Sequence, residues 1–318
     1  MRTRRLGLLV LGLMVLAAGA ELFARRVLGL GDPPLSIADP QIEYLFKPSA
    51  TYHRFGNVAH YNAWSMRSRD FERSKADPKE LRVLLLGDSV VNGGAETDQA
   101  QLASSLLEQR LSAQFQRPVI LGNVSAGSWG PPNLLAYVKR YGLFDADAVV
   151  IVLSSHDYAD APTFAPTVGV DPNYPDRTPV FALQEVFGRY LPRYVALLRP
   201  AHAEPPAKPR QRDIDWSLDS ECHLIEMARS RGIPVLVAQH LEQHEYGGRE
   251  DPGNRAIRDT AQRCGADVIA LGAAYEVAMK RGEKPYRDEI HPSSVGQRIM
   301  ADALEPWIVA HLSTTPAN

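Results

Sequence analysis

The stretch Leu81-Arg82-Val83-Leu84-Leu85-Leu86-Gly87-Asp88-Ser89 decides how this chain folds. Val83 to Leu86 form a continuous apolar run that ends at Gly87. Such a run is typical of a strand that is buried on both faces, as in a parallel sheet. Gly87 lets the backbone turn sharply, and Ser89 then stands at the carboxyl end of the strand. Open α/β sheets bind their ligands at this edge, so Ser89 is the first candidate functional residue.

Strand-like and helix-like patterns alternate after this stretch. The expected strands are residues 83–86, 118–121, 148–153, 235–238 and 268–271, and the expected helices are residues 99–115, 132–141, 214–231, 254–264 and 295–311. This alternation predicts βαβ units with right-handed crossovers and a mostly parallel sheet. We therefore expect an α/β protein, a three-layer α/β/α sandwich whose sheet resembles that of flavodoxin.

The rest of the chain is expected to be arranged around this domain, which we place at residues 81–312. Residues 1–25 form a signal peptide or signal anchor, residues 26–80 a connector and small cap with short strands or a hairpin, and residues 313–318 a tail. An insertion at 157–213 contains an aromatic helical piece at 181–198 and a polar, proline-rich stretch at 203–212. Long loops after parallel strands usually shape a ligand site.

The N-terminus has the pattern of a segment that enters a membrane. Arg2, Arg4 and Arg5 precede an uncharged, mostly apolar run from Leu6 to Ala20, as in a secretory signal, and Ala18-Gly19-Ala20 fits a cleavage site. Apolar residues continue after Glu21 to Ala24, which gives nineteen residues, close to the ~20 that span a bilayer. The segment is therefore either a cleaved signal or an anchor that leaves the remainder of the chain across the membrane.

The charge balance gives no sign of a nucleic-acid partner. The 318 residues carry a net charge of −2, and the first thirty contribute +4 through five arginines and Glu21. The remainder therefore carries about −6 and has no basic excess to neutralise phosphates.

The two cysteines, Cys222 and Cys264, lie outside any Cys-x-x-Cys motif, so we expect neither a disulfide scaffold nor a zinc site. Helices that are aligned at their carboxyl ends would separate the two residues by roughly 12 Å along the axis. Bridged Cα atoms are at most ~7 Å apart, so two free thiols are expected. The sequence implies no metal and no cofactor.

A second polar motif, Asp288-Glu289-Ile290-His291-Pro292, precedes the last expected helix. A serine hydroxyl needs an adjacent base before it can attack a carbonyl. His291 is a candidate for that base and Asp288 for the group that orients it, which is the division of labour in a Ser-His-Asp triad. Either motif alone also fits an ordinary turn or helix start. Asn123 to Gly127 and Ser155-His156-Asp157 follow two further strands, which places all four segments at one edge of the sheet.

Together these segments resemble the SGNH (GDSL-type) hydrolase family over residues 81–310. Gly87-Asp88-Ser89 followed by Gly93 is similar to the nucleophile motif, which implies that Ser89 is the nucleophile. Gly127 is similar to the glycine whose backbone N–H, with that of Ser89, forms the oxyanion hole. Asp288-x-x-His291 is similar to the last motif, which supplies acid and base.

The sequence departs from the family at its third motif. Ser154-Ser155-His156-Asp157 stands where the family has Gly-x-Asn-Asp, whose asparagine donates to the oxyanion. An imidazole N–H also donates hydrogen bonds, so His156 is expected to be the third donor.

The resemblance implies a serine esterase that removes O-acetyl or other short acyl groups from an envelope or extracellular carbohydrate. The N-terminal layout resembles membrane-anchored bacterial members linked to surface polysaccharides, which implies an inner-membrane protein facing the periplasm, or a secreted one after cleavage. Two alternatives remain: an O-acetyltransferase, or a non-catalytic carbohydrate-binding module of a polysaccharide-assembly complex, which His156 favours. A metal-dependent phosphatase or nuclease is disfavoured because no cluster of metal-binding carboxylates is evident in the sequence.

Overall fold

Five parallel strands form the central sheet of the computed structural model, which describes residues 2–197 and 208–313. The strands are β5 (Leu81–Gly87), β6 (Val119–Ser125), β7 (Ala148–Ser154), β8 (Val235–His240) and β9 (Asp267–Ala270). They lie in the order β6-β5-β7-β8-β9, which is the flavodoxin order. The prediction of a parallel, flavodoxin-like α/β sheet is confirmed.

Helices cover both faces of this sheet. They are α2 (Ser89–Asn92), α3 (Ala103–Phe115), α4 (Pro131–Tyr141), α7 (Gln211–Arg229), α8 (Pro252–Arg263), α9 (Gly272–Lys280) and α10 (Ser294–Leu312), with short turns η1 (Gln99–Gln101), η2 (Ser155–Ala159) and η4 (Gln243–Glu245). Leu84 and Leu86 pack in one core with α4, α7 and α8, whereas Val83 and Leu85 pack in a second core with α3, α9 and α10. The apolar run of β5 is continuous because both of its faces are buried. The sequence analysis did not predict α9.

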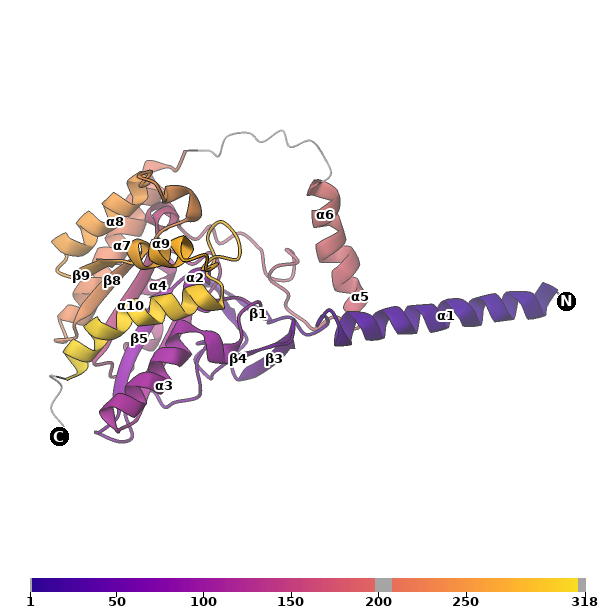
Figure 1. The fold of residues 1–318 in the computed structure, drawn as a ribbon, viewed down its shortest axis with the longest axis horizontal. Helices are drawn as coiled ribbons and strands as arrows, with labels where there is room; N and C mark the ends of the chain where they lie inside the picture. The colour runs from indigo at the N-terminus through magenta and orange to yellow at the C-terminus, as the bar shows by residue number, and fades with distance from the viewer. Residues whose placement is uncertain (1, 198–207, 314–318) are drawn as a thin grey trace.

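The N-terminal region and the insertion lie outside the sandwich. A long helix, α1 (Arg2–Arg26), extends away from it (Figure 1). Two antiparallel hairpins follow, β1 (Ser36–Asp39) with β2 (Glu43–Phe46), and β3 (Ala50–Arg54) with β4 (Asn57–Tyr61). The insertion contains α5 (Ala182–Glu185), a π-helical turn η3 (Val186–Tyr190) and α6 (Leu191–Leu197). Residues 203–207 of the expected polar stretch and 314–318 of the expected tail lie outside the described residues.

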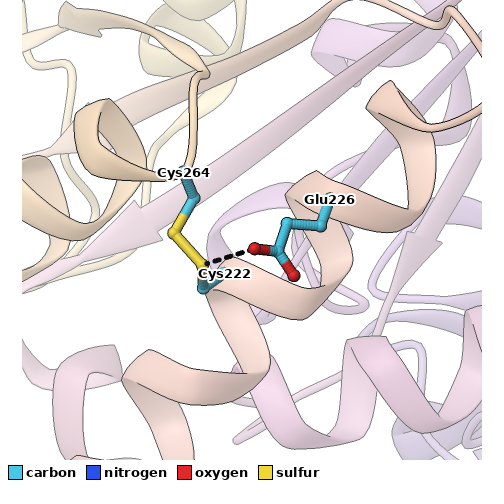
Figure 2. A group of neighbouring side chains, drawn as sticks. All are labelled: Cys222, Glu226 and Cys264. Atoms are coloured by element: carbon cyan, nitrogen blue, oxygen red, sulfur yellow. Dashed lines mark hydrogen bonds between the residues drawn. A yellow bond between two sulfur atoms is a disulfide. The ribbon is translucent and has the colours of Figure 1, made fainter.

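The expectation of two free thiols is wrong, because Cys222 and Cys264 form a disulfide (Figure 2). Their Cα atoms are 5.4 Å apart. The prediction assumed that α7 and α8 end at the same level. Instead, Cys264 directly follows α8 and lies opposite the middle of α7, which continues seven residues beyond Cys222, or about 10 Å.

Candidate active site

Ser89 occupies the sharp turn between β5 and α2. Asp88 caps α2, because its Oδ1 accepts a hydrogen bond of 2.8 Å from the N–H of Val90. Gly87 leaves room for this turn, since a Cβ at that position would lie 2.5 Å from a methyl group of Val91. The turn leaves Ser89 partly exposed, while Asp88 is buried behind it.

The structure brings Ser89, His291 and Asp288 together. His291 Nε2 lies 2.9 Å from Ser89 Oγ, and His291 Nδ1 lies 2.8 Å from Asp288 Oδ2. One nitrogen of the imidazole therefore faces the hydroxyl and the other faces the carboxylate. This is the geometry in which an imidazole removes a proton from a serine while a carboxylate fixes its tautomer.

Hydrogen bonds keep Asp288 in its charged form. Partial burial raises the pKa of this carboxyl, but the backbone N–H groups of His291 and Ile290, and then the His291 imidazole, lower it further. The balance leaves the pKa of Asp288 below its usual value. A carboxylate that stays ionised at neutral pH is the form that stabilises an imidazolium.

Side chains from other segments hold the loop that carries Asp288 and His291, and the sequence analysis did not identify them. Arg287 donates to the carbonyl oxygen of Gly93 at 2.8 Å and ties the loop to the end of α2. Gln243 donates to the carbonyl of Asp288 at 2.7 Å, and His240 Nε2 lies 2.8 Å from the carbonyl oxygen of Ile290. Burial lowers the pKa of His240, which favours a neutral ring there.

A cleft of about 520 Å³ opens over Ser89. Its walls include Ser89, Gly127, Asp288 and His291 from the sandwich, Tyr44, Phe46, Arg54 and Tyr61 from the hairpins, and Tyr174 and Arg189 from the insertion. The ring centroids of Tyr44 and Tyr174 are 4.9 Å apart, and Phe46 stacks on Tyr61 at 4.3 Å. The connector and the insertion therefore add an aromatic wall to a site whose polar groups come from the sandwich.

Gly127 lies in this cleft with Ser89, and the connector holds it there. The hydroxyl of Tyr44 donates to the carbonyl oxygen of Gly127 at 2.6 Å. A Cβ at position 127 would lie 3.4 Å from that hydroxyl, which is van der Waals contact. The sequence analysis identified Gly127 but gave no sign of its contact with Tyr44, which is 83 residues away.

His156, the expected third oxyanion donor, is not among the residues that line this cleft. Its Nδ1 lies 2.9 Å from Glu242 Oε1, and its Nε2 lies 3.6 Å from carboxylate oxygens of both Asp88 and Asp157. Burial disfavours charge on the imidazole, but Asp157, Asp88 and Glu242 outweigh it and raise the pKa of His156 to about 12. Both ring nitrogens of His156 therefore face carboxylates.

Asp88, His156 and Asp157 also offer ligand atoms within 4.8 Å of one another, a spacing that a metal ion requires. A metal-bound imidazole nitrogen must be deprotonated. The raised pKa of His156 therefore favours a proton at this position over a metal. In the other group of this kind among the described residues, Cys222 and Cys264 are engaged in the disulfide.

The comparison with protein families identifies the class of this chain. A family model described as the GDSL-like lipase/acylhydrolase family matches residues 85–299, which include Ser89, Gly127, Asp288 and His291. The match covers more than half of the 318 residues. This chain belongs to the GDSL-like lipase/acylhydrolase family and is an ester hydrolase by family.

Several solved structures are similar to this one at low identity. LAE5, an α/β hydrolase enzyme from the metagenome of Lake Arreo in Spain, is 16% identical with a TM-score of 0.44, over 74% of this chain and 96% of its own. The acetyl xylan esterase AlAXEase is 17% identical with a TM-score of 0.44, over 72% and 99%. A lipase/acylhydrolase from Enterococcus faecalis is 14% identical with a TM-score of 0.44, over 72% and 96%. The comparison with curated proteins gives no match.

Proposed function

We propose that this protein is a serine esterase that removes O-acetyl or other short acyl groups from a carbohydrate of the cell envelope or its surroundings. The observation that carries the proposal is the chain of contacts from Ser89 Oγ through His291 to Asp288, at 2.9 and 2.8 Å. The substrate class is supported by the aromatic wall of the cleft, because rings of this kind offer flat apolar faces beside polar hydroxyls.

Ester cleavage would proceed by acyl transfer. Ser89 Oγ attacks the ester carbonyl while His291 Nε2 takes its proton, and the same nitrogen then protonates the leaving alcohol. Asp288 stabilises the imidazolium through Nδ1. The backbone N–H groups of Ser89 and Gly127 would stabilise the developing oxyanion. Water, activated by the neutral His291, then attacks the acyl-enzyme and releases the acid and the free serine.

The location that fits this chain is the outer side of a cytoplasmic membrane. Residues Thr3–Arg26 of α1 are long and apolar enough to cross a membrane, with a mean hydropathy of 2.2 and none of the apolar window buried. The Cys222–Cys264 disulfide also suits an oxidising compartment. We therefore assign α1 as an anchor that holds the catalytic domain at the periplasmic face. A mature chain that begins at Glu21 would show a cleaved signal instead.

A panel of acetylated polysaccharides tests the proposed function. The wild-type protein should release acetate from at least one of them, and Ser89→Ala should release none while it keeps the native fold. Acetyl transfer to an added polymer without net release of acetate would favour the O-acetyltransferase alternative. Binding of the polymer without either reaction, unchanged in Ser89→Ala, would favour the non-catalytic module.

A further inference from the structure

The helical segment of the insertion, residues 182–197, is attached to the carboxyl end of α1. Glu21 of α1 accepts hydrogen bonds from the backbone N–H groups of Ala182 and Leu183, at 2.8 and 3.1 Å. Arg25 donates to the carbonyl oxygen of Val180 at 2.9 Å. Glu21 thus satisfies donors at the start of the segment, as a capping residue does, although it lies some 160 residues earlier in the chain.

One face of this segment packs against the rest of the protein. Ala182 is buried with Ala24 and Leu30 in a small apolar cluster. Glu185 forms a buried ion pair with Arg54 of β3 and accepts a hydrogen bond of 2.6 Å from the N–H of Gly31. These contacts fix the orientation of the segment relative to both α1 and the hairpins.

The opposite face exposes large apolar side chains. Phe187 and Tyr194 are each 63% exposed, Leu191 is 46% exposed and Val195 is 43% exposed, and Phe181 precedes them at 57%. Phe187 and Tyr194 each lie three or four residues from Leu191, and Val195 lies four residues from it, which places these four along one side of a helix. A surface helix in water normally presents polar residues on its outer face, so a row of this kind marks an interaction surface.

The position of this row of apolar side chains beside α1 indicates that a membrane covers it. The apolar side chains of α1 are exposed up to Leu22 and Phe23, which lie between the contacts that Glu21 and Arg25 make with the insertion. If α1 spans a membrane, its carboxyl end emerges at the membrane surface. Figure 1 shows α5 and α6 rising crosswise from that end of α1, which directs them along the surface. The row therefore belongs to a segment attached beside the end of α1, at the depth where Trp and Tyr side chains are favoured.

We propose that residues 182–197 form an interfacial helix whose Phe187, Leu191, Tyr194 and Val195 insert into the outer leaflet of the membrane that α1 spans. This inference rests on the proposed anchor. Helices of this type lie in the plane of the interface with their apolar face in the boundary between headgroups and acyl chains.

This contact has a consequence for the cleft. Arg189 belongs to the same helical segment and lines the cleft. Arg54 of β3, the ion-pair partner of Glu185, also lines the cleft. A membrane-bound segment would therefore hold the mouth of the active site close to the bilayer. The accessible substrates would be acyl esters in the layer of solution next to the membrane.

The test uses the full-length protein in lipid nanodiscs, with one environment-sensitive dye per variant. The native cysteines are paired in the disulfide, so a single introduced thiol takes the label. Phe187→Cys reports on the apolar row, and Tyr194→Cys is a second reporter if the first variant fails to fold. Leu13→Cys reports on α1, and Ala113→Cys, exposed near the carboxyl end of α3, is the control in water.

Spin-labelled lipids placed at several depths should quench the dyes at residues 13 and 187 but not at 113. The depth at residue 187 should be about 5–10 Å below the interface, shallower than at residue 13. Iodide, a quencher that stays in water, reports which dyes are exposed to solvent. Equal quenching of the dyes at residues 187 and 113 by iodide, with residue 13 quenched by lipid, would overturn the interfacial helix but not the anchor. Protection of residue 187 from iodide without quenching by lipid would mean that a protein covers it, which also overturns the proposal. An unquenched residue 13 would refute the anchor separately.

Discussion

Two histidines lie next to the turn at Asp88 and Ser89, and they differ in the groups that surround their ring nitrogens. His291 has a carboxylate at Nδ1 and the Ser89 hydroxyl at Nε2. His156 has carboxylates at both nitrogens and a pKa raised to about 12, with burial opposed by Asp157, Asp88 and Glu242. A base that works near neutral pH must release its proton readily. The raised pKa of His156 does not suit this role. A histidine close to a nucleophile is therefore not by itself a candidate base.

The largest expected effect is on turnover in His291→Ala. Removal of the proposed base should lower kcat on a small aryl acetate by a factor on the order of 10⁶, as in other serine hydrolases with this geometry. His223→Ala is the matched control, because His223 is exposed on α7. Steady-state kinetics and a thermal melt decide the outcome. If His291→Ala keeps its fold and more than a hundredth of the wild-type activity, His291 is not the base.

A smaller loss is expected for Asp288→Asn. The amide is isosteric but cannot stabilise an imidazolium, so kcat should fall on the order of 10⁴-fold. The exposed neighbour Glu289 provides the control, as Glu289→Gln removes one charge from the same loop. If both variants lose activity equally, the loss comes from the charge of the loop and not from the orientation of His291.

Stability, not turnover, should change most in His156→Ala. Without the imidazolium, Asp88, Asp157 and Glu242 repel one another in a buried position. We expect a loss of about 2 kcal/mol in urea unfolding, less than for a fully buried pair because His156 is 37% exposed. His156→Asn should not restore this loss, since an amide carries no charge. A fall in kcat of about 10²–10³-fold that His156→Asn repairs would instead support the oxyanion donor that the sequence predicts.

The stabilising effect of His156 should depend on pH. The folded pKa of His156 lies above the ordinary value, so its stabilising effect is complete below pH about 6.5 and declines as pH rises toward about 12. The difference in unfolding free energy between wild type and His156→Ala should therefore be smaller at pH 9 than at pH 6. A difference that stays constant or grows with pH would contradict a protonated His156.

The sequence predicts this molecule best where the signal is local. The apolar run of β5 ends at Ser89, and Asp288 and His291 are three residues apart, so both motifs could be placed at the edge of the sheet without knowledge of distant contacts. His156 contacts Glu242 from the loop after β8, and nothing in the sequence near either residue indicates the pair. Position within an element could be inferred, and the family motifs paired Ser89 with His291, but the partners of His156 across elements could not be inferred.

The disulfide and the cleft show the same limit. The Cys222–Cys264 bond depends on the position of α8 along the axis of α7, which is determined by side-chain packing. The aromatic wall depends on hairpins that fold over the sandwich, so Tyr44 reaches Gly127 across 83 residues. Hydrophobic periodicity predicts which elements form, whereas these contacts require the packed structure.

Covalent trapping of the nucleophile tests the central claim most directly. The wild-type protein should react with a fluorophosphonate ester to give one adduct per chain, and peptide mass mapping should place it on Ser89. His156→Ala should label at nearly the wild-type rate, whereas His291→Ala should label far more slowly, because His291 Nε2 is the ring nitrogen that lies 2.9 Å from Ser89 Oγ. An adduct on another residue, or equal labelling of wild type and His291→Ala, would contradict the assignment of Ser89 and His291.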